Sequence, residues 1–418
     1  MYQAVRGTSD ILPGEQAYWH YIGQKAFDIC QRYGYQRIDS PTFEETGLFT
    51  RSVGQGTDIV EKEMYTFADK GGKSITLRPE GTAPVCRAYL EHGMNNLPQP
   101  VKLYYLANIF RYERPQAGRL REHHQFGCEA VGDGDPALDA EVIDMAWQFF
   151  RSLGLQSLSL QLNSIGCRQC RPAYLALLKD YYAQQGDDLC RDCQVRLLRN
   201  PLRLLDCKQP ACQKIAKAAP KSADHLCPEC RDHFHHLQGY LKALDIPFSP
   251  NHLLVRGLDY YTRTVFEVQP RGGGAQSTIG GGGRYDDLIS ELGGKPTPAI
   301  GFAAGMERII LNLKKQDVPV PAPPGTQVFI AFMGDAARES AVSLASRLRQ
   351  AGINTIAAPG GKSLKAQLRQ ANSLGARYAV IIGEEEVSSG TASLRDMANA
   401  RQETVPLDRL AGRLRQPD

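Results

Sequence analysis

The sequence contains no apolar run long enough to span a membrane, and its first residues, MYQAVRGTSDILP, lack the hydrophobic core of a signal peptide. It has no repeat at the period of a solenoid and no long low-complexity tract. Neither sign of charge dominates, because 49 Lys and Arg stand against 45 Asp and Glu, a formal net charge of +4. These absences argue against a membrane-spanning or repeat protein, and any nucleic-acid partner would have to meet local basic patches. We expect a cytoplasmic protein with no membrane partner.

The chain is long enough for more than one folded domain. Its 418 residues, 42% of them hydrophobic and 22% charged, can form two or three domains with separate cores. It has eleven cysteines, an odd number, and eight of them fall between residues 166 and 250. This distribution suits reduced thiols or bound metal better than a disulfide framework.

A long hairpin rich in arginine is predicted between residues 102 and 132. An apolar strand runs from Leu103 to Phe110, the pattern breaks at Pro115 and Gly118, and a second strand follows. Guanidinium groups match phosphate by planar, bidentate geometry, so this hairpin is a candidate phosphate site, with a solvated charged loop as the alternative. The charged residues at its tip and edges are Arg111, Glu113, Arg114, Arg119, Arg121 and Glu122.

Polar residues also collect where a second hairpin passes into a helix. The segment SITLRPEGTA carries Arg78, Glu80 and Thr82 at the end of a strand, just before a helix expected to start near Pro84. Polar side chains at the end of a buried strand are typical of a pocket floor. Capping of the helix by Thr82 is the alternative.

Two later segments also carry polar residues suited to a ligand site. The peptide HLLVRGLDYYTRTVFEVQP crowds Arg256, Tyr260 and Tyr261 into a span too polar for a core strand and too aromatic for a plain loop. The glycines at 280–283 would let backbone lie against a ligand, or would form a flexible turn. Further on, GFAAGMER runs from a strand into a helix and places Arg308 early in that helix.

The segment from 166 to 250 is predicted to be helical and carries four close pairs of cysteines. Eight thiolates are enough for two tetrahedral zinc sites. Four histidines nearby make the ligand set ambiguous, and reduced free thiols are the favoured alternative. The cysteines are Cys167, Cys170, Cys190, Cys193, Cys207, Cys212, Cys227 and Cys230.

The C-terminal part reads as a separate α/β domain. A proline-rich linker, 318–325, precedes the alternation strand, helix, strand, helix, strand in residues 326–418. This region holds 12 Lys and Arg against 9 Asp and Glu. Lys362, Lys365 and Arg369 are candidates to contact phosphates, although a solvated helix face explains each of them equally simply.

These segments together resemble a known family. The arginine-rich hairpin and GFAAGMER resemble the second and third signature motifs of class II aminoacyl-tRNA synthetases, and the segment ending at Pro41 resembles the first. RGLDYYTRTVFE, GGGGRYD, LRPEGTA and HHQFGCE are similar to peptides of the histidyl-tRNA synthetase family, and the resemblance covers nearly the whole chain. One departure is Ala303, where the third motif usually has a glycine. The resemblance says nothing about metal at the cysteines.

The resemblance implies an α+β fold, in which a six-stranded antiparallel catalytic sheet with helices carries a helical insertion and a C-terminal α/β anticodon-binding domain. It implies a homodimer formed through the first motif. The implied reaction activates L-histidine with ATP and Mg²⁺ to histidyl-adenylate and then transfers the histidine to the 3′ end of tRNA(His). The domain ranges that follow are 1–165 with 251–317 for catalysis, 166–250 for the insertion, 318–325 for the linker and 326–418 for anticodon binding.

The resemblance also assigns roles at the nucleotide. Arg111 would hold the α-phosphate and the substrate carboxylate, Arg308 the γ-phosphate, and Arg256 would be an extra fixed cation at the reacting phosphate. Glu113 would accept a hydrogen bond from the adenine amino group, and Arg119 would also bind ATP. Fixed cations suit adenylate formation, because negative charge spreads over the α-phosphate in the transition state.

The histidine substrate would bind next to the nucleotide. A carboxylate and a phenol can satisfy both imidazole nitrogens, and no separate editing domain is evident. In the resemblance, one group of residues surrounds the α-amino group and another grips the ring. These residues are Glu80, Thr82 and Gln125 for the first, and Glu129 and Tyr261 for the second; Tyr260 is also assigned to the histidine site.

Two other classes of function stay open at this point. One is a catalytically silent paralogue that binds histidine as a regulatory subunit of histidine biosynthesis; such paralogues typically lack RGLDYYTRTVFE and the C-terminal domain, and both are present here. The other is a tRNA-binding module without activation chemistry. The three arginines Arg111, Arg256 and Arg308 argue against it.

Overall fold

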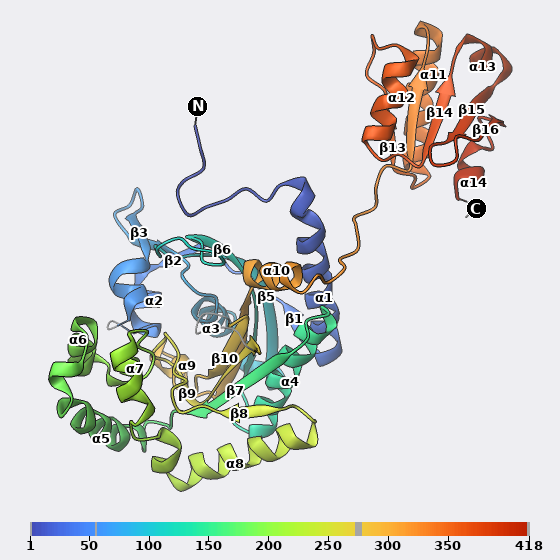
Figure 1. The fold of residues 1–418 in the computed structure, drawn as a ribbon. Coiled ribbons are helices and arrows are strands. Elements are labelled where there is room, and N and C mark those ends of the chain that lie inside the picture. The colour runs from blue at the N-terminus through green and yellow to red at the C-terminus, as the bar shows by residue number, and fades with distance from the viewer. Residues whose placement is uncertain (1, 55–56, 272–277, 416–418) are drawn as a thin grey trace. The chain divides into compact units, whose positions relative to one another are not determined.

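The computed structural model describes residues 2–54, 57–271 and 278–415 (Figure 1). The chain forms two compact units, residues 1–320 and 321–418, and each is described by itself. The boundary between them falls inside the proline-rich linker. Within the described ranges, no helix combines the length and apolarity that a membrane span requires.

The first unit is built on an eight-stranded sheet. Six central strands pair antiparallel, which confirms the expected antiparallel catalytic sheet, and a short parallel strand is added at each edge. The six-stranded sheet that the resemblance implies does not include these two edge strands. In spatial order the strands are β1 (Gln36–Arg37), β5 (Val101–Phe110), β6 (Glu122–Val131), β11 (Ala299–Gly305), β10 (Gly280–Arg284), β9 (Thr262–Pro270), β7 (Leu158–Ser164) and β8 (Phe248–Pro250).

Helices on one face of this sheet form its larger core. The ring of Phe126 in the sheet packs against Phe149 of helix α4 and against Phe302 of the neighbouring strand, with centroid distances of 4.7 and 5.6 Å. The apolar face of the first helix is buried here, and that helix ends at Gly34, which adopts a left-handed conformation with φ of 76°. The helices are α1 (Gln16–Tyr33), α4 (Pro136–Ser152), α8 (Pro228–Ala243) and α10 (Met306–Lys315).

The opposite face carries α3 (Thr82–Glu91) and α9 (Leu288–Glu291). Side chains of β5 alternate between the two faces: Tyr104 packs in the larger core, while Leu103 and Tyr105 point to the other side. A small sheet in the order β2 (Phe43–Glu45), β4 (Ser74–Leu77), β3 (Tyr65–Ala68) contains the predicted second hairpin. The helix α2 (Thr46–Ser52) and a single π-helical turn (Ile59–Glu63) lie between β2 and β3 in the chain.

The glycine run at 280–283 is a buried central strand, β10, so its interpretation as loop or turn was wrong. Each glycine is nearly inaccessible, and a Cβ on Gly282 would overlap the carbonyl oxygen of Gly301 on the neighbouring strand. Arg284 ends the strand and is fully buried between Asp139 and Asp286. The glycine-rich residues 272–277 lie outside the described residues.

The expected helical insertion is present as α5 (Arg171–Ala183), α6 (Arg191–Arg199), α7 (Pro210–Lys217) and α8, and the first three gather beside the sheet in Figure 1. The chain then returns to the main sheet through β8. Short 3-10 helices connect several elements of the first unit, at Pro13–Glu15, Met94–Asn96, Gly186–Asp188, Pro201–Leu204 and Ser222–His225.

The second unit contains the predicted strand, helix, strand, helix, strand order: β12 (Val328–Phe332), α11 (Asp335–Gln350), β13 (Thr355–Ala357), α12 (Leu364–Ser373) and β14 (Tyr378–Ile382). These three strands pair in parallel. The sequence interpretation missed the antiparallel pair that extends the sheet to five strands. The additional elements are α13 (Glu384–Ser389), β15 (Thr391–Asp396), β16 (Gln402–Pro406) and α14 (Leu410–Arg415).

We predict that Gly282→Ala destabilises the protein strongly, because the added methyl group meets backbone that cannot move aside. Overpacking of this kind costs about 1–3 kcal/mol or more. The matched control is Gly23→Ala within α1, where a Cβ meets nothing within 4 Å and should stabilise the helix slightly. Urea unfolding of both variants checks this, and equal midpoints would contradict it.

Candidate active site

A cavity of about 840 Å³ opens on the face of the main sheet that carries α3. Segments far apart in sequence meet there: the start of α3, the β5–β6 hairpin, residues 251–261, strands β9 to β11 and the start of α10. The structure brings all eleven predicted site residues to this one cavity. They are Glu80, Thr82, Arg111, Glu113, Arg119, Gln125, Glu129, Arg256, Tyr260, Tyr261 and Arg308.

The buried carboxylate of Glu80 caps helix α3. It accepts hydrogen bonds from the backbone N–H groups of Thr82 (2.7 Å) and Ala83 (2.8 Å). The helix begins at Thr82, earlier than expected, and the cap is Glu80 where Thr82 had been considered. Arg78 does not line the cavity; its guanidinium donates to carbonyls of the segment that resembles the first motif.

Glu129 forms the most deeply buried acidic group of the cavity. Its two oxygens accept hydrogen bonds from the hydroxyls of Thr82 (2.7 Å) and Tyr285 (2.5 Å). Burial raises the pKa of Glu129 to about 8, and the two hydroxyl donors offset part of that rise. Gly301 lies opposite on β11, where a Cβ would overlap the carboxylate.

Three tyrosines stand around these carboxylates. The Tyr260 hydroxyl donates to Glu80 (3.4 Å), and the rings of Tyr260 and Tyr261 are 4.8 Å apart. Tyr105 is buried between two glycines, Gly81 and Gly127, either of which would overlap its ring if it carried a Cβ. The Tyr105 hydroxyl is buried and has no hydrogen-bond partner in the described part of the chain.

The other end of the cavity is cationic. Arg111 donates to the carbonyl of Pro79 (2.7 Å), and Glu113 lies between Arg111 (3.9 Å) and Arg119 (3.3 Å). Arg308 donates to the carbonyls of Gly118 (3.2 Å) and Thr278 (2.8 Å), neither of which carries charge.

The charges of neighbouring side chains act on Arg308. Burial lowers the pKa of Arg308 and the charges of Arg119 and Arg111 lower it further, while Glu113 and Glu267 offset part of the change. Burial, followed by Arg111 and Arg308, lowers the pKa of His123 to about 3, so this imidazole is neutral at physiological pH. The arginine end of the cavity therefore holds positive charge that an anion would neutralise.

Arg256 is held beside this group by a carboxylate. It pairs with Glu267 on β9, whose other oxygen accepts a hydrogen bond from Thr278 (2.7 Å). Gly281 on β10 leaves the space that the guanidinium occupies. The Nε atom of Arg256 is buried without a hydrogen-bond partner among the described residues.

Not every arginine of the hairpin faces the cavity. Arg114 is exposed, and Arg121 stacks over the ring of Tyr112 at 3.8 Å. Neither lines the cavity. Of the arginines in this hairpin, only Arg111 and Arg119 therefore belong to the candidate phosphate site.

The chain matches two family models. Residues 7–170 and 173–309 match histidyl-tRNA synthetase, and residues 327–416 match an anticodon binding domain. The chain belongs to the histidyl-tRNA synthetase family. A histidine–tRNA ligase from Dehalococcoides mccartyi is 63% identical over 410 residues, 98% of each chain, and one from Desulforudis audaxviator is 53% identical over 98% of this chain and 97% of its own. These matches confirm the resemblance stated from the sequence.

Solved structures of this family share the fold. The apo histidyl-tRNA synthetase of S. aureus is 38% identical, aligns over 100% of both chains and has a TM-score of 0.84. A structure from Bacillus halodurans described as an ATP phosphoribosyltransferase regulatory subunit/histidyl-tRNA synthetase has a TM-score of 0.66 at 21% identity, over 92% of this chain and 98% of that one. At that identity the likeness concerns the fold alone, so the fold does not separate an enzyme from a regulatory paralogue.

The cavity also contains residues to which sequence reasoning gave no role, among them Tyr105, His123, Glu267 and Tyr285. Three of them lie in peptides quoted above: Tyr285 in GGGGRYD, Glu267 in the same peptide as Arg256, and His123 at the start of HHQFGCE. Tyr105 carried no signal, because it reads as an ordinary member of a strand. The places of Tyr105 and His123 in the site follow from strand pairing in the β5–β6 hairpin.

We predict that Glu129 makes the protein less stable as pH rises. The unfolded carboxyl loses its proton near pH 4.3, whereas the folded one keeps it to about pH 8. Between these values only the unfolded state ionises, so rising pH lowers the free energy of the unfolded state relative to that of the folded state. Glu129→Gln should remove this loss of stability. From pH 5 to pH 8, the unfolding midpoint of the unaltered protein should therefore fall relative to that of Glu129→Gln. The control is Glu45→Gln at an exposed carboxyl. Parallel profiles for Glu129→Gln and the unaltered protein would contradict the prediction.

Proposed function

We propose that this chain is a histidine–tRNA ligase that activates L-histidine with ATP and transfers it to the 3′ end of tRNA(His). One observation carries the proposal: three arginines distant in sequence share a cavity with a carboxylate and tyrosine pocket. The family membership supports the same reaction. Catalysis is assigned to residues 1–165 and 251–317, with 166–250 as insertion, 318–325 as linker and 326–418 as the anticodon-binding domain.

The cationic end suits the polyphosphate of ATP. Arg111 and Arg256 would hold the α-phosphate as the histidine carboxylate attacks it, and Arg308 would hold the γ-phosphate. Because Arg308 is held by neutral carbonyls, its charge is available to a phosphate. Cations fixed before the reaction stabilise charge in the transition state without the cost of reorienting them.

The adenine ring would lie near Glu113 and Arg119, which already contact each other. Glu113 would accept from the adenine amino group, and Arg119 can stack on a flat ring through its guanidinium. This places the base at the exposed side of the arginine group, since the side chain of Arg119 is 40% exposed against 18% for Glu113.

Mg²⁺ fits the cavity as an ion carried by ATP. The carboxylates near the arginines, Glu113 and Glu267, are hard oxygen donors of the kind it prefers, and both already pair with arginine. The phosphates would therefore supply most of its ligands, with either glutamate as a protein ligand. Bound Mg²⁺ would neutralise charge on the polyphosphate.

The other end suits histidine. Glu80 would attract the α-amino group with Thr82 and Gln125, and Glu129 with the tyrosines would contact the imidazole. Because the pKa of Glu129 is about 8, its carboxyl can donate or accept near neutral pH, which matches the donor and acceptor of a neutral imidazole. A substrate without these nitrogens would leave buried polar groups unpaired, at about 1–3 kcal/mol each.

The second unit would bind the anticodon of tRNA(His). Lys362, Lys365 and Arg369 are exposed at and near α12, where they can reach phosphates. Binding through such contacts should weaken steeply with salt. We also infer that the protein works in the cytoplasm, where tRNA is charged for translation.

Histidine-dependent exchange between ATP and pyrophosphate tests the proposal. Purified protein with Mg²⁺ should exchange pyrophosphate with histidine and not with other amino acids. Absence of exchange would favour a regulatory or tRNA-binding paralogue and remove the proposal.

We predict that Arg256→Ala lowers the exchange rate by roughly 10²- to 10³-fold while histidine binds nearly as before, because the cation acts on charge that develops in the transition state. Exchange kinetics and histidine titration measure the two effects separately. The control is Arg114→Ala, which removes an exposed arginine outside the cavity. An equal loss of histidine affinity in Arg256→Ala would make it a binding residue.

We infer a homodimer that uses the segment resembling the first motif. Phe27 of α1, in this segment, and Phe43 of β2, just after it, are exposed by 45% and 53%, and a second copy of the chain would cover them. Phe43→Asp should then shift the protein toward monomer, as measured by light scattering at micromolar concentration. The control is Leu198→Asp, at an apolar residue exposed on α6. A monomeric unaltered protein would contradict the inference.

A further inference from the structure

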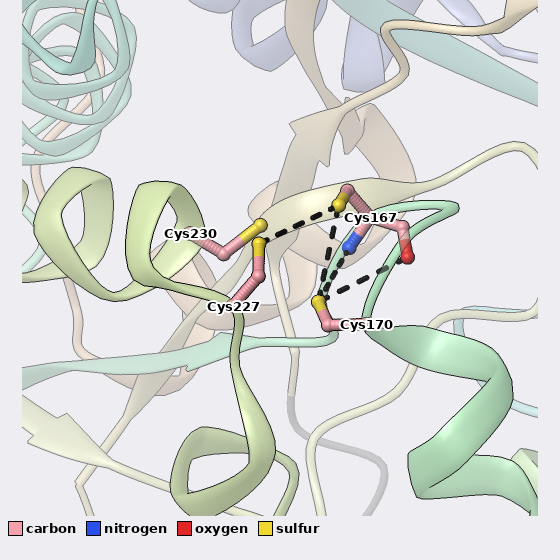
Figure 2. A group of neighbouring side chains, drawn as sticks. All are labelled: Cys167, Cys170, Cys227 and Cys230. Carbon is pink, nitrogen blue, oxygen red and sulfur yellow. Dashed lines mark hydrogen bonds between the residues drawn. The ribbon is translucent and has the colours of Figure 1, made fainter.

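The eight cysteines of the insertion gather into two separate groups of four. Cys167 and Cys170 meet Cys227 and Cys230, and the sulfur atoms turn toward a common centre (Figure 2). The second group comprises Cys190, Cys193, Cys207 and Cys212, and in each group all four sulfurs lie within 4.8 Å of one another.

The spacing of the sulfurs fits a single tetrahedral ion. A Zn–S bond of about 2.3 Å puts thiolates at tetrahedral corners about 3.8 Å apart. The Sγ atoms of Cys167 lie 3.9 Å from Cys170 and 3.8 Å from Cys227, and those of Cys190 and Cys207 are 3.8 Å apart. A disulfide would need about 2.05 Å, and all eleven cysteines are free.

The surroundings stabilise negative sulfur. Cys190 and Cys227 each stand immediately before a helix, α6 and α8, and Cys170 stands before α5, so helix N-termini point at both groups. Backbone N–H groups also donate to sulfur: that of Cys167 to Cys170 (3.3 Å) and that of Cys190 to Cys212 (3.3 Å).

The nearby histidines do not compete for these positions. His233 is buried and bonded to Asp139 (2.8 Å), and in the described ranges each candidate group consists of cysteine alone. Four thiolates with tetrahedral spacing select zinc, or iron in a similar site, over harder cations. A cluster of several irons would hold its thiolates farther apart than one ion does.

We propose that the insertion binds two structural zinc ions, each through four cysteine thiolates. The first ion, at Cys167, Cys170, Cys227 and Cys230, ties the start of the insertion to a point 60 residues later. This ion would fix the junction between the insertion and the main sheet. At that junction Arg171 donates to the carbonyls of Gly166 (3.0 Å) and of Tyr261 (2.5 Å), and Tyr261 lines the cavity.

The second ion organises a wall of the cavity. Helices α6 and α7 have nine and eight residues, too short to be stable alone, and Cys193 is the one buried side chain of α6. A bound metal ion would cross-link these short helices, as in other small modules. Next to it, Arg203 contacts the carbonyl of Arg256 (3.5 Å) and Asn200 donates to Asp259 (2.7 Å). The wall residues that line the cavity include Asp192, Arg196, Arg203, Lys208 and Gln213.

Metal content tests the proposal without reference to activity. Protein purified without a metal-affinity tag should contain two zinc ions per chain by mass spectrometry. Cys190→Ser with Cys193→Ser should lose one ion, and Cys227→Ser with Cys230→Ser should lose the other. Cys30→Ala and Cys86→Ala, outside both groups, should keep two.

Three further measurements on the unaltered protein avoid dependence on variant folding. In the unaltered protein, a mercurial reagent should release both ions as the eight thiols react, and cobalt substitution should give the strong visible absorption of a tetrahedral thiolate site. Trypsin should cut α6 faster once the second ion is removed. Folded, unaltered protein with no more than one zinc per chain, or with iron in its place, would overturn the proposal.

Discussion

The cavity depends on a patch of sheet that has no side chains. Gly127, Gly281 and Gly301 lie on adjacent central strands, β6, β10 and β11, and each leaves space that a functional side chain fills. The ring of Tyr105, the guanidinium of Arg256 and the carboxylate of Glu129 occupy these spaces. Glycine weakens a strand, so several glycines at the centre of a sheet lower its stability. In return, functional side chains can lie directly against the strands.

Positive charge and a buried carboxyl lie at opposite ends of that glycine floor. Burial and the charges of Arg119 and Arg111 lower the pKa of Arg308 at one end, while the buried Glu129 holds its proton at the other. A substrate with phosphates and an imidazole can relieve both sources of electrostatic cost. The bound phosphates supply the negative charge that the arginines of the free cavity lack. Binding energy is therefore directed to the place where the phosphate reacts.

The pattern of apolar and polar residues predicted a helix or strand correctly wherever the element's own residues determine its structure. The alternation of β12, α11, β13, α12 and β14 was predicted from the sequence. The pattern failed at β10, because four glycines have low strand propensity and only pairing with β9 and β11 holds them extended. The β15–β16 pair was missed for a related reason, since its exposed edge carries few apolar residues to signal a strand.

The sequence by itself determined the chemical inventory: the arginines and carboxylates at the ends of predicted elements, the paired cysteines and the peptides of the family. Tertiary structure decided which of these meet. Arg308 joins the cavity while Arg114 does not, and eight cysteines spread over some sixty residues divide into two groups of four. Spacing along the chain determines which side chains share one face of a short helix or strand. Which of these side chains meet depends on sheet order and on packing between segments more than a hundred residues apart.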